Sequence, residues 1–345
     1  MNTVRVNASK SYNIFIGREI LAELGHHVLS LGKVKTVCIV SETNVFPLFG
    51  QTVEESLKSA GFRTVTFVFP AGEKSKCPKV YLELLNFLAE NHLTRTDLIV
   101  ALGGGVTGDL AGFAAATYLR GIRFVQVPTT LLAAVDSSVG GKTAIDLPAG
   151  KNLAGSFCQP SLVLCDLNTL DTLPEEVFRD GCAEVIKYGV LYDPNLFDHL
   201  LVHGLDFDRE RVITRCVELK RDVVMRDEYD TGTRMKLNLG HTFGHGIEAK
   251  SNFTLSHGKA VAIGMAIVAR ACACPDTGKI LDILNRFGLP TATDISADEI
   301  LSYTLSDKKR SADQVSLILP NAIGNCSVVP VPVTELKSFL QAGLK

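Results

Sequence analysis

The sequence predicts an α/β domain built on a parallel sheet, followed by an all-α domain, and three observations lead to this prediction. The chain has 345 residues, more than the roughly 250–300 residues at which a single hydrophobic core stops growing. Its first half alternates apolar runs typical of buried strands with amphipathic segments typical of helices, which predicts a parallel sheet covered on both faces. After about Asn168 the pattern is mostly helical. We therefore expect domains at residues 1–166 and 167–345.

Five short apolar runs are the expected strands of the first domain, because such runs are typical of strands buried in a sheet. They lie at residues 37–40, 65–69, 98–102, 124–127 and 162–165. Helices are expected between them at residues 45–60 and 79–91. In the second of these, Val80, Leu84 and Leu88 recur at helical spacing, which predicts one apolar face.

Helical segments dominate the second domain. The run Leu173-Pro174-Glu175-Glu176 indicates a helix start, because proline suits the first turn and acids stabilise the positive end of a helix. Beyond residue 275 the sequence indicates only a few helices and an apolar run at 315–319. The expected helices lie at residues 179–191, 209–227, 240–251 and 258–273.

Composition excludes several classes of protein. Hydrophobic residues make up 46% and charged residues 21% of the chain, which is typical of globular proteins and excludes a disordered or collagenous chain. Lys+Arg is 35 and Asp+Glu is 37, so no basic excess suggests nucleic acid or an anionic membrane as a partner. The N-terminus lacks the apolar core of a signal peptide, and no apolar stretch is long enough to span a membrane. We therefore expect a cytoplasmic protein.

The nine cysteines are scattered from Cys38 to Cys326. A large chain with scattered thiols fits a reducing compartment and does not need disulfides. Cys272 and Cys274 form the one close pair, but a one-residue gap is not the usual zinc spacing. We interpret them as two packed thiols.

A glycine-rich loop follows the expected strand at 98–102. The run from Gly103 to Asp109, GGGVTGD, precedes an apolar helix expected at 110–119. Glycines let the backbone approach a pyrophosphate, and the helix N-terminus offers free N–H groups. The spacing fits G-x-G-x-x-G, but the loop follows a late strand and no acid lies about 20 residues further on. A tight structural turn therefore remains the alternative to nucleotide binding at this loop alone.

Three further polar segments lie in the same domain. Residues 70–76, PAGEKSK, close the strand at 65–69, where open α/β sheets bind cofactors; a solvated charged turn is the alternative. Residues 128–131 start a helix with two hydroxyls, and residues 135–143 form a second glycine loop with a lysine. A lysine beside small residues binds phosphate as readily as it forms a surface turn. Together these segments favour a Rossmann-like nucleotide-binding domain.

The second domain carries the histidines that could bind a metal ion. The run NLGHTFGHGIE places His241 and His245 one turn apart on one helical face, and His257 opens the next helix. Glu184 lies in the helix at 179–191 with Lys187 one turn later. A catalytic zinc needs three protein ligands and one open position, and spacing alone pairs His241 with His245. Capping or a core hydrogen bond is the alternative for any single histidine, and we assign it to His26, His27, His92, His199 and His203.

Cations accompany these motifs along the chain. Most such side chains are solvated on a surface, but if they converge they would hold a substrate that carries both a phosphate and a carboxylate. They are Lys142, Lys187, Lys220, Arg234 and either Lys308 or Lys309.

The order of these motifs resembles the 3-dehydroquinate synthases, sugar-phosphate cyclases of the shikimate pathway. The resemblance covers most of residues 35–270, and the C-terminal residues match more loosely through LILPNAIG and Asp307-Lys308-Lys309. Lys259 stands where many relatives carry an acid. The matching runs are PAGEKSK (70–76), GGGVTGDLAGFAA (103–115), ATYLRGI (116–122), VPTTLLAAVDSSVGGKTAID (127–146), KNLAGSF (151–157), AEVIKYG (183–189), LNLGHTFGHGIE (237–248) and SHGKAVAIGM (256–265).

The resemblance implies a dehydroquinate synthase-like fold and a phosphate-eliminating lyase. Its substrate would be a seven-carbon keto-acid sugar phosphate, 3-deoxy-D-arabino-heptulosonate 7-phosphate, and its products 3-dehydroquinate and phosphate. The implied steps are transient oxidation by bound NAD, phosphate elimination, reduction and intramolecular aldol closure. A metal-dependent alcohol or polyol dehydrogenase, a sister sugar-phosphate cyclase and a cofactor-binding protein with a decayed site are the alternatives.

The resemblance also implies roles for individual residues. The zinc or cobalt ligands would be Glu184, His241 and His257, which revises the pairing suggested by spacing and places His245 near the substrate. Arg120 matches an arginine that reaches into the neighbouring subunit, so a homodimer is implied. Substrate contacts would come from Asp136, Lys142, Asn152, Lys187, Lys220, Arg234, Asn238 and His245. NAD would contact Glu42, Ala71, Gly72, Glu73, Lys74, Ser75, Lys76, Gly105, Val106, Thr107, Gly108, Asp109, Thr129, Thr130, Lys142, Lys151, Thr169, Leu170, Asp171 and Thr172.

Overall fold

The computed structural model describes residues 1–251, 254–308 and 313–344, and the chain divides into two compact units. The first contains Met1–Pro174 and Cys216–Tyr229, and the second contains Glu175–Arg215 and Asp230–Lys345. Residues 309–312, and with them Lys309, lie outside the described residues, as does the side chain of Lys308.

The observed division differs from the boundary expected after residue 166. The 3₁₀ turn Leu167–Thr172 stays with the first unit, because the Asp166 carboxylate caps it by accepting the Asn168 N–H at 2.9 Å and Leu170 is buried. The segment Cys216–Tyr229 also belongs to the first unit. Helical periodicity along the chain carries no information about which unit a helix joins.

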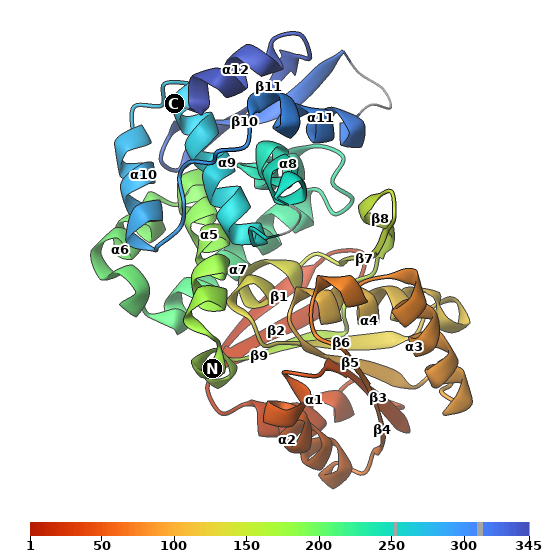
Figure 1. Cartoon of the computed structure of the whole chain (residues 1–345). Helices are drawn as coiled ribbons and strands as arrows, with labels where there is room; N and C mark the ends of the chain where they lie inside the picture. Colours follow the sequence, from red (N-terminus) through yellow and green to blue (C-terminus); the bar gives the residue numbers. More distant parts are fainter. Residues whose placement is uncertain (252–253, 309–312, 345) are drawn as a thin grey trace. The chain divides into compact units, whose positions relative to one another are not determined.

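A seven-stranded sheet forms the centre of the first unit (Figure 1). The strands run in the order β1-β2-β9-β6-β5-β3-β4; β1 pairs antiparallel with β2, and every other pairing is parallel. All five predicted strands are present, and the β1–β2 hairpin is an addition to them. The bounds are β1 (Asn2–Asn7), β2 (Ser11–Gly17), β3 (Thr36–Glu42), β4 (Arg63–Phe69), β5 (Leu98–Gly103), β6 (Arg123–Pro128) and β9 (Leu162–Asp166).

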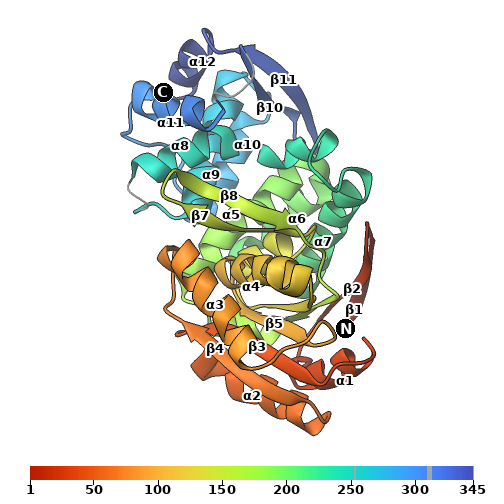
Figure 2. The same cartoon turned by 90° about the vertical axis from the view of Figure 1, so that its right-hand side faces the viewer.

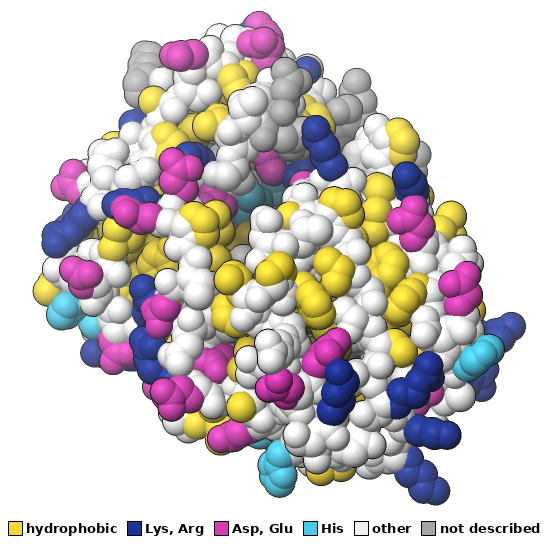
Figure 3. Space-filling model, turned by 60° about the horizontal axis from the view of Figure 1, so that its bottom comes forward, with side chains coloured by type: hydrophobic (Ala, Val, Ile, Leu, Met, Phe, Trp, Pro, Cys, Tyr) yellow, Lys and Arg dark blue, Asp and Glu magenta, His cyan; other side chains and the backbone are white. Residues whose placement is uncertain are grey.

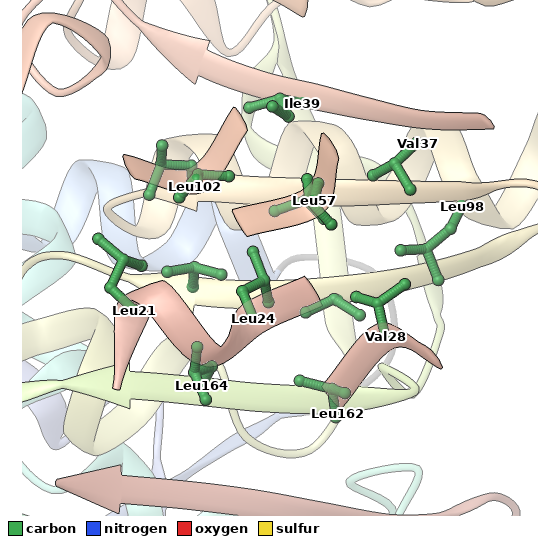
Figure 4. Close-up of a cluster of buried hydrophobic side chains, with 14 of the residues drawn as sticks. Leu21, Leu24, Val28, Val37, Ile39, Leu57, Leu98, Leu102, Leu162 and Leu164 are labelled. Carbon is green, nitrogen blue, oxygen red and sulfur yellow. The ribbon is translucent and has the colours of Figure 1, made fainter. Parts of the chain in front are cut away.

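Helices cover both faces of this sheet, as predicted. Because successive strand side chains point to opposite faces, Val37 and Ile39 of β3 pack with Leu24 of α1 and Leu57 of α2 (Figure 4), whereas Cys38 packs with α3 and α4. Each fully buried leucine contributes about 1.5–3 kcal/mol relative to an exposed one. The helices are α1 (Leu24–Leu29), α2 (Phe46–Ser59), α3 (Pro78–Glu90) and α4 (Gly105–Thr117), and a second hairpin pairs β7 (Lys142–Leu147) with β8 (Gly150–Phe157).

The second unit is mainly helical, as predicted, but it is not purely α. The apolar run at 315–319 is part of strand β10, which pairs antiparallel with β11 beside α12 (Figure 2). Helix α7 (Arg209–Arg226) begins in this unit and ends in the first. The other elements are α5 (Glu175–Tyr192), α6 (Pro194–His203), α8 (His241–Lys250), α9 (His257–Ala271), α10 (Thr277–Arg286), α11 (Ala297–Lys308), β10 (Gln314–Ala322), β11 (Asn325–Pro332) and α12 (Leu336–Gly343).

Surface charge and thiols agree with the composition. On the face drawn in Figure 3, acidic and basic side chains are interspersed. All nine cysteines are free thiols. Within the described ranges, no helix combines the length and the apolar character needed to cross a membrane.

Candidate active site

Three side chains of the second unit converge on one point. Glu184 comes from the middle of α5, while His241 and His257 are the first residues of α8 and α9. Glu184 Oε1 lies 3.2 Å from Nε2 of His241 and 3.2 Å from Nε2 of His257. Two ligands of a tetrahedral zinc ion lie about 3.3 Å apart, because zinc–ligand bonds measure about 2.0–2.1 Å. Both distances from Glu184 therefore match the spacing of zinc ligands, and all three donor atoms lie within 4.8 Å of one another.

Polar contacts behind the imidazoles orient both rings toward Glu184. His241 Nδ1 lies within hydrogen-bond distance of the Leu239 carbonyl oxygen, at 3.0 Å, and His257 Nδ1 faces the Glu248 carboxylate at 3.8 Å, the distance of an ion pair. A proton held on Nδ1 leaves Nε2 with a free lone pair, which is the tautomer that a metal ligand requires.

The charges around Glu184 shift the pKa values of the groups that face one another in this site. Burial alone would raise the pKa of Glu184, but the Lys187 ammonium and His241 hold it well below its usual range. Burial would lower the pKa of His257, yet hydrogen bonds to Glu184 and Glu248 raise it to about 10. Burial and the Lys187 ammonium lower the pKa of His241, so the group combines an ionised carboxylate with a neutral imidazole, the forms in which these side chains bind zinc.

His245 belongs to the same cluster without supplying a donor atom to it. Its ring centroid lies 5.3 Å from that of His241 and 6.2 Å from that of His257. Among the described residues, Glu184, His241 and His257 are the one group of His, Cys, Asp or Glu side chains whose ligand atoms all lie within 4.8 Å. The His241–His245 pairing suggested by helical spacing is therefore not the group that the structure brings together.

Close helix packing brings the third imidazole to Glu184. A Cβ atom at Gly258 would overlap the backbone carbonyl oxygen of Asp180 on α5, so only glycine lets the start of α9 approach α5 this closely. Asp180 Oδ1 accepts the Lys259 N–H at 3.1 Å and the Ser256 hydroxyl. Asp180 was not among the predicted site residues; its one signal is that it precedes Glu184 by four positions, on the same helical face.

Two buried cations lie in the same unit. Lys187 is 1% exposed and forms an ion pair with Glu184. Arg234 is 2% exposed and lies in the 3₁₀ turn Thr233–Asn238 that precedes α8, whereas Asn238 is exposed. Charged side chains this buried are costly unless paired, and for Lys187 the Glu184 carboxylate supplies the pairing.

In the first unit, the predicted cofactor residues follow the carboxyl ends of five neighbouring parallel strands. Since such ends meet at one edge of a sheet, the structure brings these segments to a common edge. Residues 105–109 form the first turn of α4 rather than a loop before it, because this helix begins at Gly105 and not near the expected residue 110. The segments are Glu42 as the last residue of β3, 70–76 after β4, 105–109 after β5, 129–130 after β6 and 169–172 after β9.

Ion pairs join several of these segments. Lys76 Nζ lies 2.5 Å from Asp109 Oδ2 and donates to Asn152 Oδ1 at 2.6 Å. Lys151 pairs with Glu73 at 3.3 Å. Burial raises the pKa of Asp109, although Lys76 opposes that shift. In the same unit Lys220 pairs with Asp136 at 3.0 Å, while Lys142 and Arg120 are exposed.

Two hydroxyls at this edge have no hydrogen-bond partner in the described part of the chain. Thr107 and Thr129 are 1% and 2% exposed, and neither Oγ1 atom has a partner there. Buried hydroxyls are nearly always paired, because an unpaired one loses its hydrogen bonds to water without replacement. The two orphaned groups therefore fit a bound cofactor that supplies the missing partners.

Comparisons with known proteins agree with this architecture. A crystal structure of 2-deoxy-scyllo-inosose synthase complexed with carbaglucose-6-phosphate, NAD+ and Co2+ matches with a TM-score of 0.89 and 26% identity, over 99% of this chain and 100% of that one. ValA, a 2-epi-5-epi-valiolone synthase from Streptomyces hygroscopicus subsp. jinggangensis 5008 with NAD+ and Zn2+ bound, matches with a TM-score of 0.87 and 28% identity, over 98% of each chain. The fold is thus that of the sugar-phosphate cyclase class.

Sequence comparison narrows this class to one family. The family models for 3-dehydroquinate synthase N-terminal and C-terminal regions match residues 66–180 and 181–310. The chain is 46% identical to the 3-dehydroquinate synthase of Pelobacter propionicus over 97% of its length and 98% of the relative's. It is 42% identical to that of Streptococcus suis, over 96% and 97%. The chain belongs to the 3-dehydroquinate synthase family.

Proposed function

We propose that this protein is a 3-dehydroquinate synthase that converts 3-deoxy-D-arabino-heptulosonate 7-phosphate to 3-dehydroquinate and phosphate in aromatic amino acid biosynthesis. The observation that carries the proposal is the Glu184–His241–His257 group with Lys187 paired to Glu184. It occurs in a chain 42–46% identical to curated 3-dehydroquinate synthases over nearly its full length.

The residues present fit the two groups that this reaction requires, a divalent metal ion and NAD. Glu184, His241 and His257 would hold zinc or cobalt, and the sheet edge with Thr107 and Thr129 would hold NAD. When bound, the metal polarises a secondary hydroxyl of the substrate, and NAD accepts a hydride from that carbon and later returns it.

The chain's own residues would hold the substrate and screen its charge. Lys142, Asn152, Lys187 and Arg234 are assigned to the two anionic ends, since ammonium, amide and guanidinium groups donate to phosphate and carboxylate oxygens. Asp136, Lys220, Asn238 and His245 are assigned to the remaining substrate contacts. Holding one reactive geometry is the main contribution that these residues make to the rate.

Arg234 offers a direct test of this assignment. Arg234→Ala is expected to raise KM about tenfold or more, because a hydrogen bond to a charged group contributes about 1.5–3 kcal/mol. Arg226, exposed at the end of α7, supplies the matched control, and Arg226→Ala is expected to leave KM unchanged. Unchanged KM and turnover in Arg234→Ala would exclude Arg234 from substrate binding.

We propose a homodimer in which Arg120 acts on the partner's site. The backbone at Arg120 supports this proposal. Leu119 and Arg120 both have left-handed conformations, with φ of 51° and 65°, and both are exposed. Non-glycine residues hold such conformations at a cost and mark functional turns. Co-expression of inactive Arg120→Ala with inactive His241→Ala is expected to restore activity in mixed dimers; no restoration would place Arg120 elsewhere.

Phosphate release with trace NAD separates the candidate activities. A 3-dehydroquinate synthase releases phosphate from the seven-carbon substrate without NADH accumulating at 340 nm, because the cofactor is regenerated in each turnover. Stoichiometric NADH from a simple polyol would instead identify a dehydrogenase. Binding of zinc and NAD without phosphate release would identify a decayed site.

A further inference from the structure

Asp146 of β7 connects two residues assigned to ligand binding, although no motif identified it as a site residue. Its Oδ1 atom accepts the backbone N–H of Asn152 at 2.8 Å. Its own backbone N–H donates to the carbonyl oxygen of Lys76 at 2.8 Å. Lys76 Nζ in turn donates to the side chain of Asn152 at 2.6 Å. These three contacts close a ring through Asp146, Asn152 and Lys76.

The backbone at Asn152 is irregular in a way that the Asp146 carboxylate stabilises. The β7–β8 pairing shifts register between Ile145 and Leu147, which places a bulge opposite Asp146. Asn152, in the bulged segment of β8, has a φ of 56°, in the left-handed region that residues other than glycine seldom adopt. Bulges re-aim side chains, and here the bulge turns the Asn152 side chain toward Lys76.

The Lys76 contact also fixes the orientation of the Asn152 amide. An ammonium group only donates hydrogen bonds, so the amide oxygen of Asn152 must face Lys76 and the amide nitrogen must point away. The described residues supply no partner for the Asn152 amide nitrogen, and the residue is exposed. Asn152 is thereby prepared to donate to an acceptor on a ligand, such as a phosphate or carboxylate oxygen.

We propose that Asp146 is a positioning residue, whose carboxylate holds the Asn152 bulge so that the Asn152 amide donates to the substrate. This inference rests on the proposed function, because it takes Asn152 as a substrate contact. Its effect on catalysis passes through Asn152, so loss of Asp146 should matter only while the Asn152 amide is present.

A double-mutant cycle in the NAD- and metal-loaded protein tests this dependence. Asp146→Ala is expected to lower kcat/KM about ten- to hundredfold, mainly through KM, because a displacement of about 1 Å in a substrate contact has effects of this size. In an Asn152→Ala background the same change is expected to alter kcat/KM less than threefold. Asp146→Asn retains an acceptor oxygen and is expected to keep most of the activity.

The control is Glu54→Ala, which removes an acid that pairs with Lys58 and Thr66 on α2 and β4, and it is expected to leave kcat/KM unchanged. Equal losses from Asp146→Ala in both backgrounds, or no loss in either, would overturn the role of Asp146. No phosphate release by the unaltered protein would instead overturn the proposed function. Faster amide hydrogen exchange at Asn152 in Asp146→Ala is expected irrespective of the reaction, and unchanged exchange would overturn the positioning contact itself.

Discussion

Asp180 holds the start of α9, so its removal should weaken metal binding without removing a ligand. Asp180 Oδ1 accepts the Lys259 N–H at 3.1 Å and the Ser256 hydroxyl, the two donors that flank His257. Losing such a helix cap costs about 0.5–2 kcal/mol of stability. Supporting residues of this kind change metal affinity about ten- to hundredfold when mutated. We therefore expect Asp180→Ala to raise the zinc dissociation constant by that factor while Glu184, His241 and His257 remain in place.

The measurement is competition for zinc against a chromophoric chelator, with the free energy of unfolding determined in parallel. Asp193 supplies a matched control in the same unit, because it caps α6 by accepting the N–H groups of Asn195 at 3.0 Å and Leu196 at 3.1 Å. Asp193 also pairs with Arg215 at 2.5 Å, so Asp193→Ala should lose at least as much stability and keep its zinc affinity. Equal zinc affinity in the Asp180 and Asp193 variants would refute the reasoning.

Three further outcomes follow from the structure. Asp97→Asn should lower the free energy of unfolding by about 2–4 kcal/mol at pH 7, because an amide would face the donors that the buried carboxylate now satisfies. Burial would raise the pKa of Asp97, but the hydrogen bonds that it accepts lower it overall, so its contribution is present above the unfolded pKa of about 3.9. That contribution is lost as pH falls through the lower folded pKa, and urea titrations across pH should show the variant converging with the unaltered protein there. Gly264→Ala should destabilise the second unit severely in thermal unfolding, because its Cβ atom would overlap the Gly240 carbonyl oxygen. The control is Gly278→Ala on α10, where the Cβ atom has open space and the variant should gain up to about 1 kcal/mol of stability. Equal effects of the two substitutions would contradict this. Thr129→Val should lower NAD affinity in calorimetry without loss of stability, because its hydroxyl has no partner to lose among the residues that the structure describes. An unchanged NAD affinity would remove Thr129 from the cofactor site.

Strands buried on both faces could be predicted from the sequence because burial leaves them as continuous apolar runs. Strand β5, for example, is buried at every position. The β1–β2 hairpin was missed because β1 alternates buried and exposed residues at the edge of the sheet. The β7–β8 hairpin cannot be predicted in this way, because its glycines and lysines are equally typical of ligand-binding loops.

The metal group shows where local patterns stop being informative. Helical spacing relates His241 to His245, but the donor atoms that converge come from three different helices. Which helices meet depends on contacts such as Gly258 against the backbone of Asp180, and no periodicity encodes these. The motif resemblance supplied Glu184 and His257, whereas Asp146, Asp180 and Glu248 were found only from the structure.

Charge balance around the metal group separates the two enzyme classes that share this fold. Glu184 and Glu248 contribute two negative charges and Lys187 one positive charge, all close to the imidazoles. A divalent ion would convert this net single negative charge into a net single positive charge, with both imidazoles neutral. A neutral polyol would leave that charge uncompensated in a buried site, where charges are costly. An anionic substrate compensates it, and for this reason the buried Lys187 favours a sugar-phosphate cyclase over a dehydrogenase of simple alcohols.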